Sequence, residues 1–363
     1  MKPFENMKRG MGVGGWMTNY KRVRFLPADR AMDITIGDRE HFDRYLTKWD
    51  IQNIRSFGMD HIRIPFDQCV IEEHDRPYSY REDMLKLLDR VIDWSLEEGL
   101  EVVLNLHHAF GCYCDFAEAS SLLDDEALKV RLIRLWEMLE DRYHDKDIVF
   151  EILNEVTTTD AEAWNALAKR AVAALRAKNP TRRIIIGSAQ WNSVDRLKDL
   201  DLFDDEYIGY TYHFYGPFAF THQRTTVNPQ QYLYNREIPY PGDRSYYQDY
   251  ARFNGQDASE FDDYPIVGRE YIEKALSPAA EWKKAHPDKF LWFGEFGTIR
   301  HANLIWRENW MRDVIRTTVE NDIPFCNWNY LSTPYDCNRF SLVTDDDRRI
   351  VSQEMLRLIQ GKI

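Results

Sequence analysis

The chain is predicted to fold as a (β/α)8 TIM barrel in a single domain, because apolar runs of strand length alternate with helical stretches and eight such runs occur. The expected strands are residues 10–16, 61–65, 101–107, 148–154, 183–188, 207–212, 290–295 and 324–328. A length of 363 residues suits one barrel with generous loops. In such a barrel the active site lies at the carboxyl ends of the strands.

Helical periodicity occurs between most of these strands. The expected helices are residues 41–57, 81–98, 125–143, 161–178, 270–286 and 304–321. A doubly wound open sheet is the alternative fold, but it usually carries a glycine-rich phosphate loop that leads into a helix. Here the run G-M-G-V-G-G-W leads into a basic, loop-like segment, so the signal for a dinucleotide site is weak.

Charge and composition narrow the class of ligand. A formal net charge of -13 argues against nucleic acid and anionic membranes, because both would favour a basic face. No apolar run approaches the ~18 residues of a membrane span, and the amino terminus lacks the apolar core of a signal peptide. The cysteines follow no disulfide framework, which favours a reducing compartment; they are Cys69, Cys112, Cys114, Cys326 and Cys337. We therefore expect a cytoplasmic protein that acts on a neutral ligand without a cofactor.

Two glutamates close apolar strand candidates. Glu155 ends the run D-I-V-F-E-I-L-N-E, and Glu295 ends the run F-L-W-F-G-E. A carboxylate at the end of a buried strand is costly unless it has a use, since burial penalises its charged form. A single glutamate of this kind is more often solvated or salt-bridged. A pair in different surroundings is typical of glycoside hydrolysis, in which one carboxyl donates a proton and the other attacks the sugar.

Polar and aromatic residues also gather at the other strand ends. They would face the same rim as the two glutamates, and they are Arg63, His107, His108, Asn154, Trp191, Asn192, His213, Tyr215 and Trp328. Each has a plainer interpretation, such as a structural ion pair for Arg63 or a core histidine for His213. His108 should point to the opposite side of its strand from His107, so we leave it out of the candidate site.

The two histidines also stand near Cys112 and Cys114, and imidazoles with thiolates are the ligands that zinc prefers. However, metal-dependent barrel hydrolases usually carry a His-x-His motif on the first strand, and no histidine occurs there in this chain. The sequence therefore predicts no metal site.

With these residues in place, the chain resembles the retaining glycoside hydrolases of family five, the cellulase and β-mannanase family of clan A. The resemblance spans nearly the whole barrel. Its most specific parts are I-L-N-E at Glu155 and W-F-G-E-F-G at Glu295. Supporting parts are H-I-R-I-P at Arg63, L-N-L-H-H at His107, Y-H-F-Y at His213 and N-W-N-Y at Trp328.

The resemblance implies two catalytic roles. Glu155 would be the general acid/base and Glu295 the nucleophile, with carboxyls about 5 to 5.5 Å apart and a covalent glycosyl-enzyme intermediate. Arg63 and Tyr215 would hydrogen-bond the nucleophile, and the Arg63 guanidinium would keep Glu295 ionised and lower its pKa.

The resemblance also implies substrate-binding roles for the remaining candidates. Asn154 would hold the sugar 2-hydroxyl, His107 would bind sugar hydroxyls, His213 would lie near the acid/base, and Trp328 would form a stacking floor.

The connection over residues 216–269, after the sixth strand, is unusually long and tyrosine-rich. We expect it to wall the site into a pocket for a chain end. With a cytoplasmic location, this favours an exo-acting β-mannosidase on short β-1,4-mannosyl saccharides, among them mannosyl-N-acetylglucosamine. The alternatives are a β-glucosidase or an endo-β-1,4-glucanase of the same family. A carbohydrate-binding barrel without turnover is a further alternative, which the intact pair of carboxylates disfavours.

Overall fold

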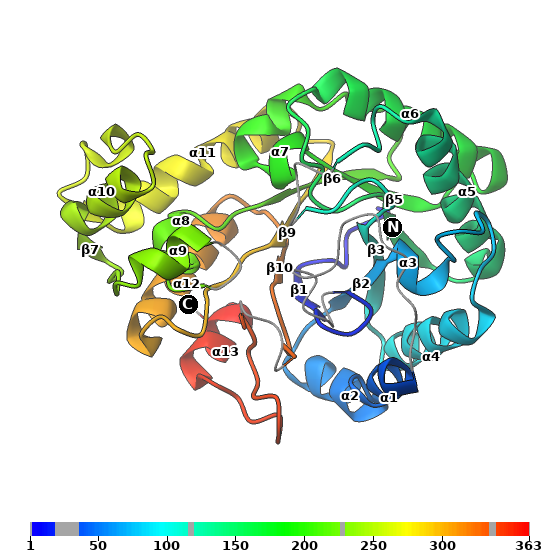
Figure 1. Cartoon of the computed structure of the whole chain (residues 1–363), viewed down its shortest axis with the longest axis horizontal. Coiled ribbons are helices and arrows are strands. Elements are labelled where there is room, and N and C mark those ends of the chain that lie inside the picture. The colour runs from blue at the N-terminus through cyan, green and yellow to red at the C-terminus, as the bar shows by residue number, and fades with distance from the viewer. Residues whose placement is uncertain (1, 19–35, 115–119, 226–228, 334–338, 363) are drawn as a thin grey trace.

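A computed structural model of the chain describes residues 2–18, 36–114, 120–225, 229–333 and 339–362. Its centre is a closed barrel of parallel strands, in which β1 pairs with both β2 and β10 (Figure 1). The barrel strands are β1 (Arg9–Gly12), β2 (His61–Asp67), β3 (Glu101–His108), β4 (Ile148–Glu151), β5 (Arg183–Gly187), β6 (Ile208–His213), β9 (Phe290–Glu295) and β10 (Phe325–Asn327). The predicted (β/α)8 barrel is thus confirmed.

Helices surround the barrel on its outside (Figure 1). The longer ones are α1 (Ile36–Arg44), α2 (Lys48–Ser56), α4 (Glu82–Glu97), α5 (Glu126–Tyr143), α6 (Ala161–Lys178), α11 (Arg269–Ala285) and α12 (Leu304–Glu320). Short elements α3 (Gln68–Ile71) and α7 (Ala189–Asn192) follow β2 and β5, a 3-10 helix spans Val194–Asp199, and α13 (Gln353–Ile359) lies near the carboxyl terminus. Among the described residues, no helix has both the length and the apolar character needed to cross a bilayer.

The prediction of one helix over residues 41–57 is wrong. The chain instead forms α1 and α2, and α2 begins at a capping box in which the Thr47 hydroxyl accepts from the Asp50 amide and the Asp50 carboxylate accepts from the Thr47 amide. This start signal interrupts the apolar periodicity that the sequence carries across it.

Four strands end earlier than predicted: β1 at Gly12, β4 at Glu151, β5 at Gly187 and β10 at Asn327. Beyond β4 the backbone no longer forms regular strand pairing, but it still hydrogen-bonds to β5 and β3. The Ile152 amide donates to the Ile185 carbonyl at 3.1 Å, and the Asn154 amide donates to the Leu106 carbonyl at 2.9 Å. Apolar character therefore continues past the end of the regular strand.

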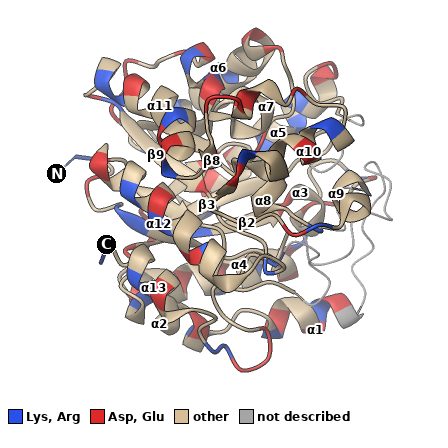
Figure 2. Cartoon of the chain, turned by 90° about the vertical axis from the view of Figure 1, so that its left-hand side faces the viewer, with Lys and Arg blue, Asp and Glu red and all other residues tan. Residues whose placement is uncertain are grey.

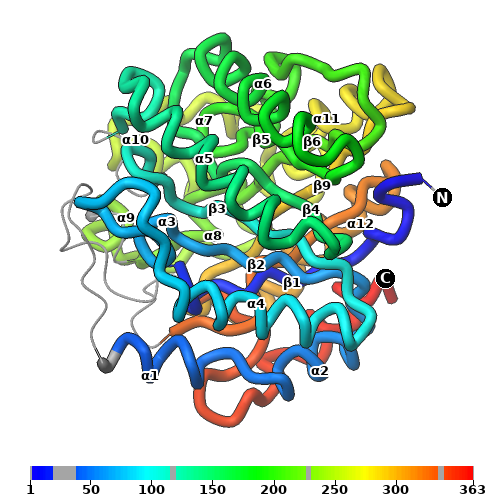
Figure 3. Tube along the Cα trace, turned by 90° about the vertical axis from the view of Figure 1, so that its right-hand side faces the viewer, coloured from blue at the N-terminus to red at the C-terminus, as the bar shows by residue number. Residues whose placement is uncertain are grey.

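Side chains inside the barrel form layers because alternate residues of each strand point inward. The layer at the amino ends of the strands is apolar, and Phe4 and Met7 of the amino-terminal segment pack beneath it; it contains Val103, Val149, Ile185, Trp292 and Cys326. The next layer lies two residues further along the strands and is polar. It includes Asn105 of β3, Glu151 of β4 and Arg63 of β2. Figure 3 shows both termini at one end of the barrel, opposite α3, so the amino-terminal segment closes the bottom of the barrel.

The long connection after β6 forms a small folded insertion instead of a plain loop. It contains α8 (Phe218–Thr221), α9 (Pro229–Tyr234), α10 (Arg244–Phe253), a 3-10 helix (Ser259–Phe261) and the hairpin of β7 (Gly242–Asp243) with β8 (Ile266–Val267). In Figure 1, α10 and β7 lie at the outer left edge, away from the barrel strands. This distal part of the insertion therefore does not cover the barrel.

Charged residues of both signs are mixed along the outer helices, as Figure 2 shows for one side of the molecule. Many of them pair across or along helices, for example Arg142 with Glu82 and Asp89. The negative net charge is therefore not gathered into one acidic face on the side shown.

Candidate active site

Glu295 is aimed into the barrel mouth by an irregularity in its strand. Strict alternation would place it on the same side as Phe293, whose ring stacks on Tyr212 with centroids 4.7 Å apart. The register between β6 and β9 instead shifts, because Tyr212 pairs with Phe293 and His213 with Glu295, which leaves Gly294 unpaired. A Cβ at Gly294 would lie 2.5 Å from the Thr211 hydroxyl, so only glycine fits this bulge.

Both carboxylate oxygens of Glu295 accept hydrogen bonds. Arg63 Nη1 donates to Oε1, and the Tyr215 hydroxyl donates to Oε2 at 2.9 Å. Burial raises the pKa of Glu295 above its usual value, with only partial compensation from the nearby positive charge of Arg63. The expectation of a lowered pKa for Glu295 is therefore wrong. The guanidinium of Arg63 does lower this pKa, but Glu295 is only 4% exposed, and the loss of hydration raises the pKa by more.

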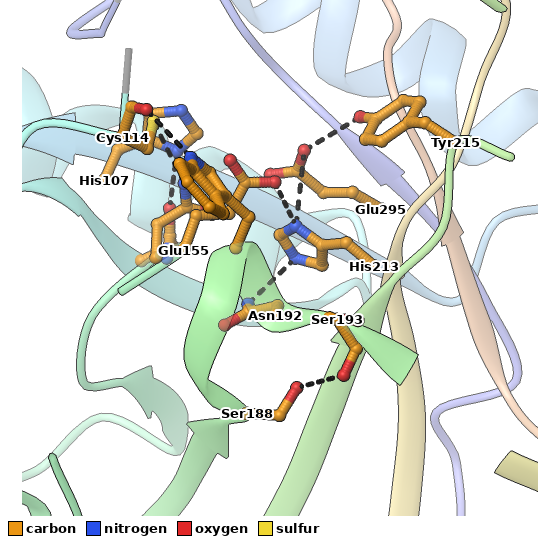
Figure 4. A network of polar contacts seen from close by, with 12 residues as sticks. His107, Cys114, Glu155, Ser188, Asn192, Ser193, His213, Tyr215 and Glu295 are labelled. Atoms are coloured by element: carbon orange, nitrogen blue, oxygen red, sulfur yellow. Dashed lines mark hydrogen bonds and ion pairs between the residues drawn. The ribbon is translucent and has the colours of Figure 1, made fainter. Parts of the chain in front are cut away.

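Glu155 lies past the end of β4 in a left-handed backbone conformation, with a φ of 43°. This conformation is uncommon for a residue with a side chain, and strained residues of this kind cluster at functional sites. Its carboxylate oxygen Oε1 lies 2.7 Å from His213 Nδ1, and His213 Nε2 accepts from the Asn192 amide at 3.2 Å (Figure 4). The His213 proton is thereby assigned to Nδ1, where it is donated to Glu155.

His213 lies between the two glutamates and also approaches Glu295 Oε2 at 3.8 Å. Burial lowers the pKa of His213 to about 4, so its imidazole is neutral near pH 7. One oxygen of each glutamate and a ring nitrogen of His213 lie within 4.8 Å of one another. Carboxyls this close leave room for a sugar carbon and its bond to oxygen but not for an additional water, which is the arrangement of retaining glycosidases.

Glu151 belongs to this site although the sequence analysis did not select it. It is fully buried on β4 and binds Arg63 through two contacts, from Nε at 2.6 Å and from Nη2 at 2.8 Å. Arg63 Nη2 also donates to the Asn154 amide oxygen at 2.8 Å. Burial alone would lower the pKa of Arg63, but Glu151 and Glu295 raise it, so the guanidinium stays charged. The signal that could have found Glu151 is its place as the last residue of β4, two residues after the inward-facing Val149.

We expect Glu151→Gln to lower kcat/KM by about 10²-fold, because Arg63 would lose its ionic anchor and shift relative to Glu295. The same change should cost roughly 3–5 kcal/mol of unfolding free energy, because it leaves a buried charge without its partner. The matched control is Glu140→Gln, which removes a carboxylate from a second buried pair, with Arg182. Urea unfolding should show both variants destabilised, and only Glu151→Gln should slow hydrolysis; equal activity in the two variants would contradict the positioning role.

Trp328 lies against Arg63 and His107 and is almost fully buried. Its ring stacks on His107 at 5.6 Å between centroids, and the Arg63 guanidinium lies 5.9 Å from it. Cβ atoms at Gly12 and Gly14 would lie within 2.8 Å of the Trp328 ring. Gly12 and Gly14 of the G-M-G-V-G-G-W run are thus explained by the close approach of Trp328, whereas Gly10 lies against His61 and Gly15 has a φ of 78°.

His107 and His108 do not point to opposite sides as expected. Their ring centroids are only 5.0 Å apart, and His108 Nδ1 lies 2.7 Å from Asp67 Oδ1. The register between β2 and β3 shifts at Phe66 and Asp67, which removes strict alternation at this point. Burial lowers the pKa of His107 well below its usual value, so this ring is neutral near pH 7.

Of the four cysteines in the described part of the chain, none forms a disulfide. Cys114 is half-buried and lies beside His108, whereas Cys112 is buried and is not part of the group formed by His107, His108 and Cys114. Cys337 lies outside the described residues.

Tyr215 is held by His222 from the insertion. The His222 ring stacks on Phe218 at 4.0 Å and meets Tyr215 edge-on at 5.2 Å between centroids. Burial lowers the pKa of His222 to about 3. Burial and the nearby Glu295 raise the pKa of Tyr215 well above its usual value, so its hydroxyl remains a donor.

We expect His222→Phe to make stability less sensitive to acid. In the unfolded chain a histidine takes up a proton near pH 6.5, while folded His222 stays neutral, so the wild type loses stability as pH falls. Between pH 7 and pH 5 this one group should account for about 2 kcal/mol of lost unfolding free energy. Urea unfolding at both pH values measures the difference. An equal pH dependence in the variant would show that His222 is protonated in the folded protein.

Two tryptophans at predicted strand ends differ in role. Trp16 is fully buried and donates to the Phe42 carbonyl at 2.7 Å, so it belongs to the core. Trp191 is 45% exposed, and its indole nitrogen donates to the Cys114 carbonyl at 2.9 Å. Gln190, Trp191 and Asn192 all have positive φ, which fixes an unusual turn behind Glu155.

A polar cavity of about 310 Å3 is formed in part by the segment that begins two residues after Glu155. It is lined by Ser120, Leu123, Asp124, Thr157, Thr158, Thr159, Asp160 and Ala163. Hydroxyl and carboxylate groups predominate in this lining, so the cavity suits a hydroxyl-rich ligand.

Comparison with known proteins agrees with this geometry. A model of the family described as cellulase (glycosyl hydrolase family 5) matches residues 32–333. Endoglucanase C of Acetivibrio thermocellus is 34% identical over 98% of this chain and 98% of its own length. Cellodextrinase A of Ruminococcus flavefaciens is 30% identical over 80% of this chain and 76% of its own length. The solved structure of Thermotoga maritima Cel5A with mannotriose is 25% identical, with a TM-score of 0.73, and covers 98% of this chain and 99% of its own.

Proposed function

This chain belongs to glycosyl hydrolase family 5, and from that premise we propose that it is an endo-acting β-1,4-glucanase that cleaves cello-oligosaccharides and soluble β-glucan. The observation that carries the proposal is similarity to an endoglucanase over nearly the whole of both chains. The relative named cellodextrinase supports the same class of sugar. The proposal takes the endo-glucanase alternative of the sequence analysis in preference to the exo-β-mannosidase.

In the proposed reaction Glu295 is the nucleophile and Glu155 the acid/base. The Glu295 carboxylate attacks the anomeric carbon while Glu155 gives its proton to the departing glycosidic oxygen, so one C–O bond forms as another breaks. Glu155 then takes a proton from water, which attacks the same carbon and releases Glu295. Two hydrogen bonds to Glu295, from Arg63 and Tyr215, hold the attacking carboxylate in place.

In this proposal the remaining candidate residues bind the sugar ring that reacts. Trp328 presents a flat ring for stacking, and His107 lies against it to bind hydroxyls. The Asn154 carbonyl oxygen accepts from Arg63, so its amide nitrogen is the group directed to the sugar 2-hydroxyl. His213 donates to Glu155 and fixes the orientation of its carboxyl.

We assign the binding of further sugar units on the leaving-group side to Trp191 and to the polar cavity. Trp191 presents an exposed ring held by its indole contact to Cys114, and the polar cavity begins at Thr157, two residues after Glu155. Binding on both sides of the cleaved bond is what an endo-acting enzyme requires. The distal part of the insertion lies at the outer edge of the molecule and not over the barrel strands, where the sequence analysis expected it to wall the site (Figure 1).

We expect Trp191→Ala to raise KM for cellotetraose or longer substrates by about fivefold while changing kcat for a short aryl glycoside little. Stacking of a sugar on an exposed aromatic ring contributes about 1 kcal/mol, and this contribution applies only to substrates that reach it. Steady-state kinetics on substrates of increasing length measure the effect. An equal rise in KM for the short aryl glycoside would place Trp191 in the reacting subsite instead.

Product analysis separates the proposed function from its alternative. Cellohexaose and mannohexaose, each labelled at the reducing end, are incubated with enzyme and sampled at low conversion. Early mid-chain products from cellohexaose support an endo-β-1,4-glucanase. Single mannose units released from the unlabelled end of mannohexaose, with cellohexaose intact, would overturn the proposal in favour of an exo-β-mannosidase. The cytoplasmic location stays a prediction.

A further inference from the structure

Three groups that bind soft metal ions meet at the edge of the catalytic site. One ligand atom each from His107, His108 and Cys114 lies within 4.8 Å of the others. The Cys114 sulfur is already 3.3 Å from His108 Nε2, close to the separation that two ligands have on one tetrahedral zinc ion. Figure 4 shows Cys114 next to His107, on the far side of Glu155 from Tyr215.

The surroundings orient both imidazoles for such a role. The Asp67 carboxylate binds His108 Nδ1 at 2.7 Å and so leaves Nε2 directed at the sulfur. Asn105 Oδ1 lies 3.1 Å from His107 Nδ1. A carboxylate or amide oxygen on the second nitrogen of a histidine is the usual support for a metal ligand, because it fixes the tautomer and the ring orientation.

We propose that His107, His108 and Cys114 form an inhibitory site for a zinc-class divalent cation, one that competes with substrate and takes no part in hydrolysis. Three protein ligands leave a fourth position open to water. The inference goes beyond the proposed function, since cation binding here does not depend on which glycan the enzyme cleaves.

Inhibition follows from the residues that the cation would occupy. Bound metal would occupy a ring nitrogen of His107 and so remove it from hydrogen bonding with a sugar. The Asn154 amide nitrogen approaches the Cys114 sulfur at 3.8 Å, so a metal on that sulfur would also disturb the group directed to the sugar 2-hydroxyl. When the Cys114 sulfur binds the ion, its thiol proton is released to solvent, and no other bond changes.

The test uses cobalt(II) as a spectroscopic probe for zinc, added to reduced, metal-free full-length enzyme. Cobalt bound by a thiolate gives a charge-transfer band that carboxylate and imidazole ligands do not give. We expect a saturable band with one cobalt per chain, zinc inhibition that a chelator reverses, and an affinity that falls about 10²-fold or more in Cys114→Ser. Chelation of the untreated enzyme should leave its rate unchanged or raise it.

Matched controls distinguish this site from others. Cys112→Ser changes a nearby thiol whose pKa burial raises to about 11, and Cys337→Ser changes the cysteine outside the described residues; both should keep the band. His108→Gln should weaken it even if Cys114→Ser fails to fold, as judged by circular dichroism. The proposal is overturned if the folded wild type gives no saturable band. It is also overturned if the band is lost in Cys337→Ser but kept in Cys114→Ser. Zinc inhibition without a thiolate band would assign the ion to Glu155, His213 and Glu295, and also overturns it.

Discussion

Replacing Glu295 with glutamine is expected to lower kcat by a factor on the order of 10⁴ to 10⁶, the range found when a covalent nucleophile is removed. Glutamine keeps the size of the side chain and can still contact Arg63 and Tyr215, so the loss would report the attacking oxygen and not a collapsed site. Initial rates on cellotetraose measure the effect. The substrate should still bind, because Trp328 and His107 are untouched.

The matched control is Glu206→Gln, which makes the same chemical change at an exposed position and should leave kcat unchanged. A second measurement tests the covalent step directly. A 2-fluoro-substituted cellobioside with a good leaving group should form a lasting ester, and peptide mass spectrometry should find it on Glu295. An ester on another residue, or full activity in Glu295→Gln, would refute the assignment.

Removing the acid/base is expected to have an effect that depends on the leaving group. Glu155→Ala should slow hydrolysis of cello-oligosaccharides by about 10² to 10⁴-fold, because the departing sugar oxygen needs a proton. An aryl glycoside with an acidic phenol needs no proton, so its first step should be little affected and only release of the glycosyl-enzyme should slow. Measuring the pre-steady-state burst of phenol separates these steps.

Azide provides the complementary check on Glu155. A small anion needs no general base and can occupy the space left by the side chain, so it should restore the rate of Glu155→Ala and yield the β-glycosyl azide. Glu206→Ala serves as the control and should show no azide effect. An α-configured product would contradict the retaining arrangement, and the absence of rescue would show that the loss has another cause.

The loss of wild-type activity on the acid side should persist in Glu155→Ala, because that variant keeps Glu295. Glu295 must be ionised to attack, and its raised pKa places the loss of activity at a higher pH than an ordinary glutamate would.

The barrel and the identity of the two glutamates could be predicted from sequence because both rest on local patterns. Strand-length apolar runs alternate with helical periodicity along the chain, and each glutamate stands where such a run stops. Asn154, His213 and Tyr215 follow from their position relative to those same strand ends. The boundaries of β1, β4 and β10 were less accurate, because apolar character continues beyond the last ladder bond.

The tertiary structure decided everything that depends on partners distant in the chain. The bulge at Gly294 turns Glu295 inward only because β6 offers Thr211 and His213 beside it. Glu151 became part of the site because a strand separated from it in sequence brings Arg63 to it.

By itself, then, the sequence determined the (β/α)8 fold, the pair of carboxylates and the family, since these depend on residue type and spacing. Only the tertiary structure decided the direction of the Glu295 pKa shift, the pairing of Arg63 with Glu151 and the meeting of His107 with His108. The physical reason is common to all three: desolvation, strand register and ion pairing are set by neighbours in space, and period-two alternation cannot anticipate where a register shift interrupts it.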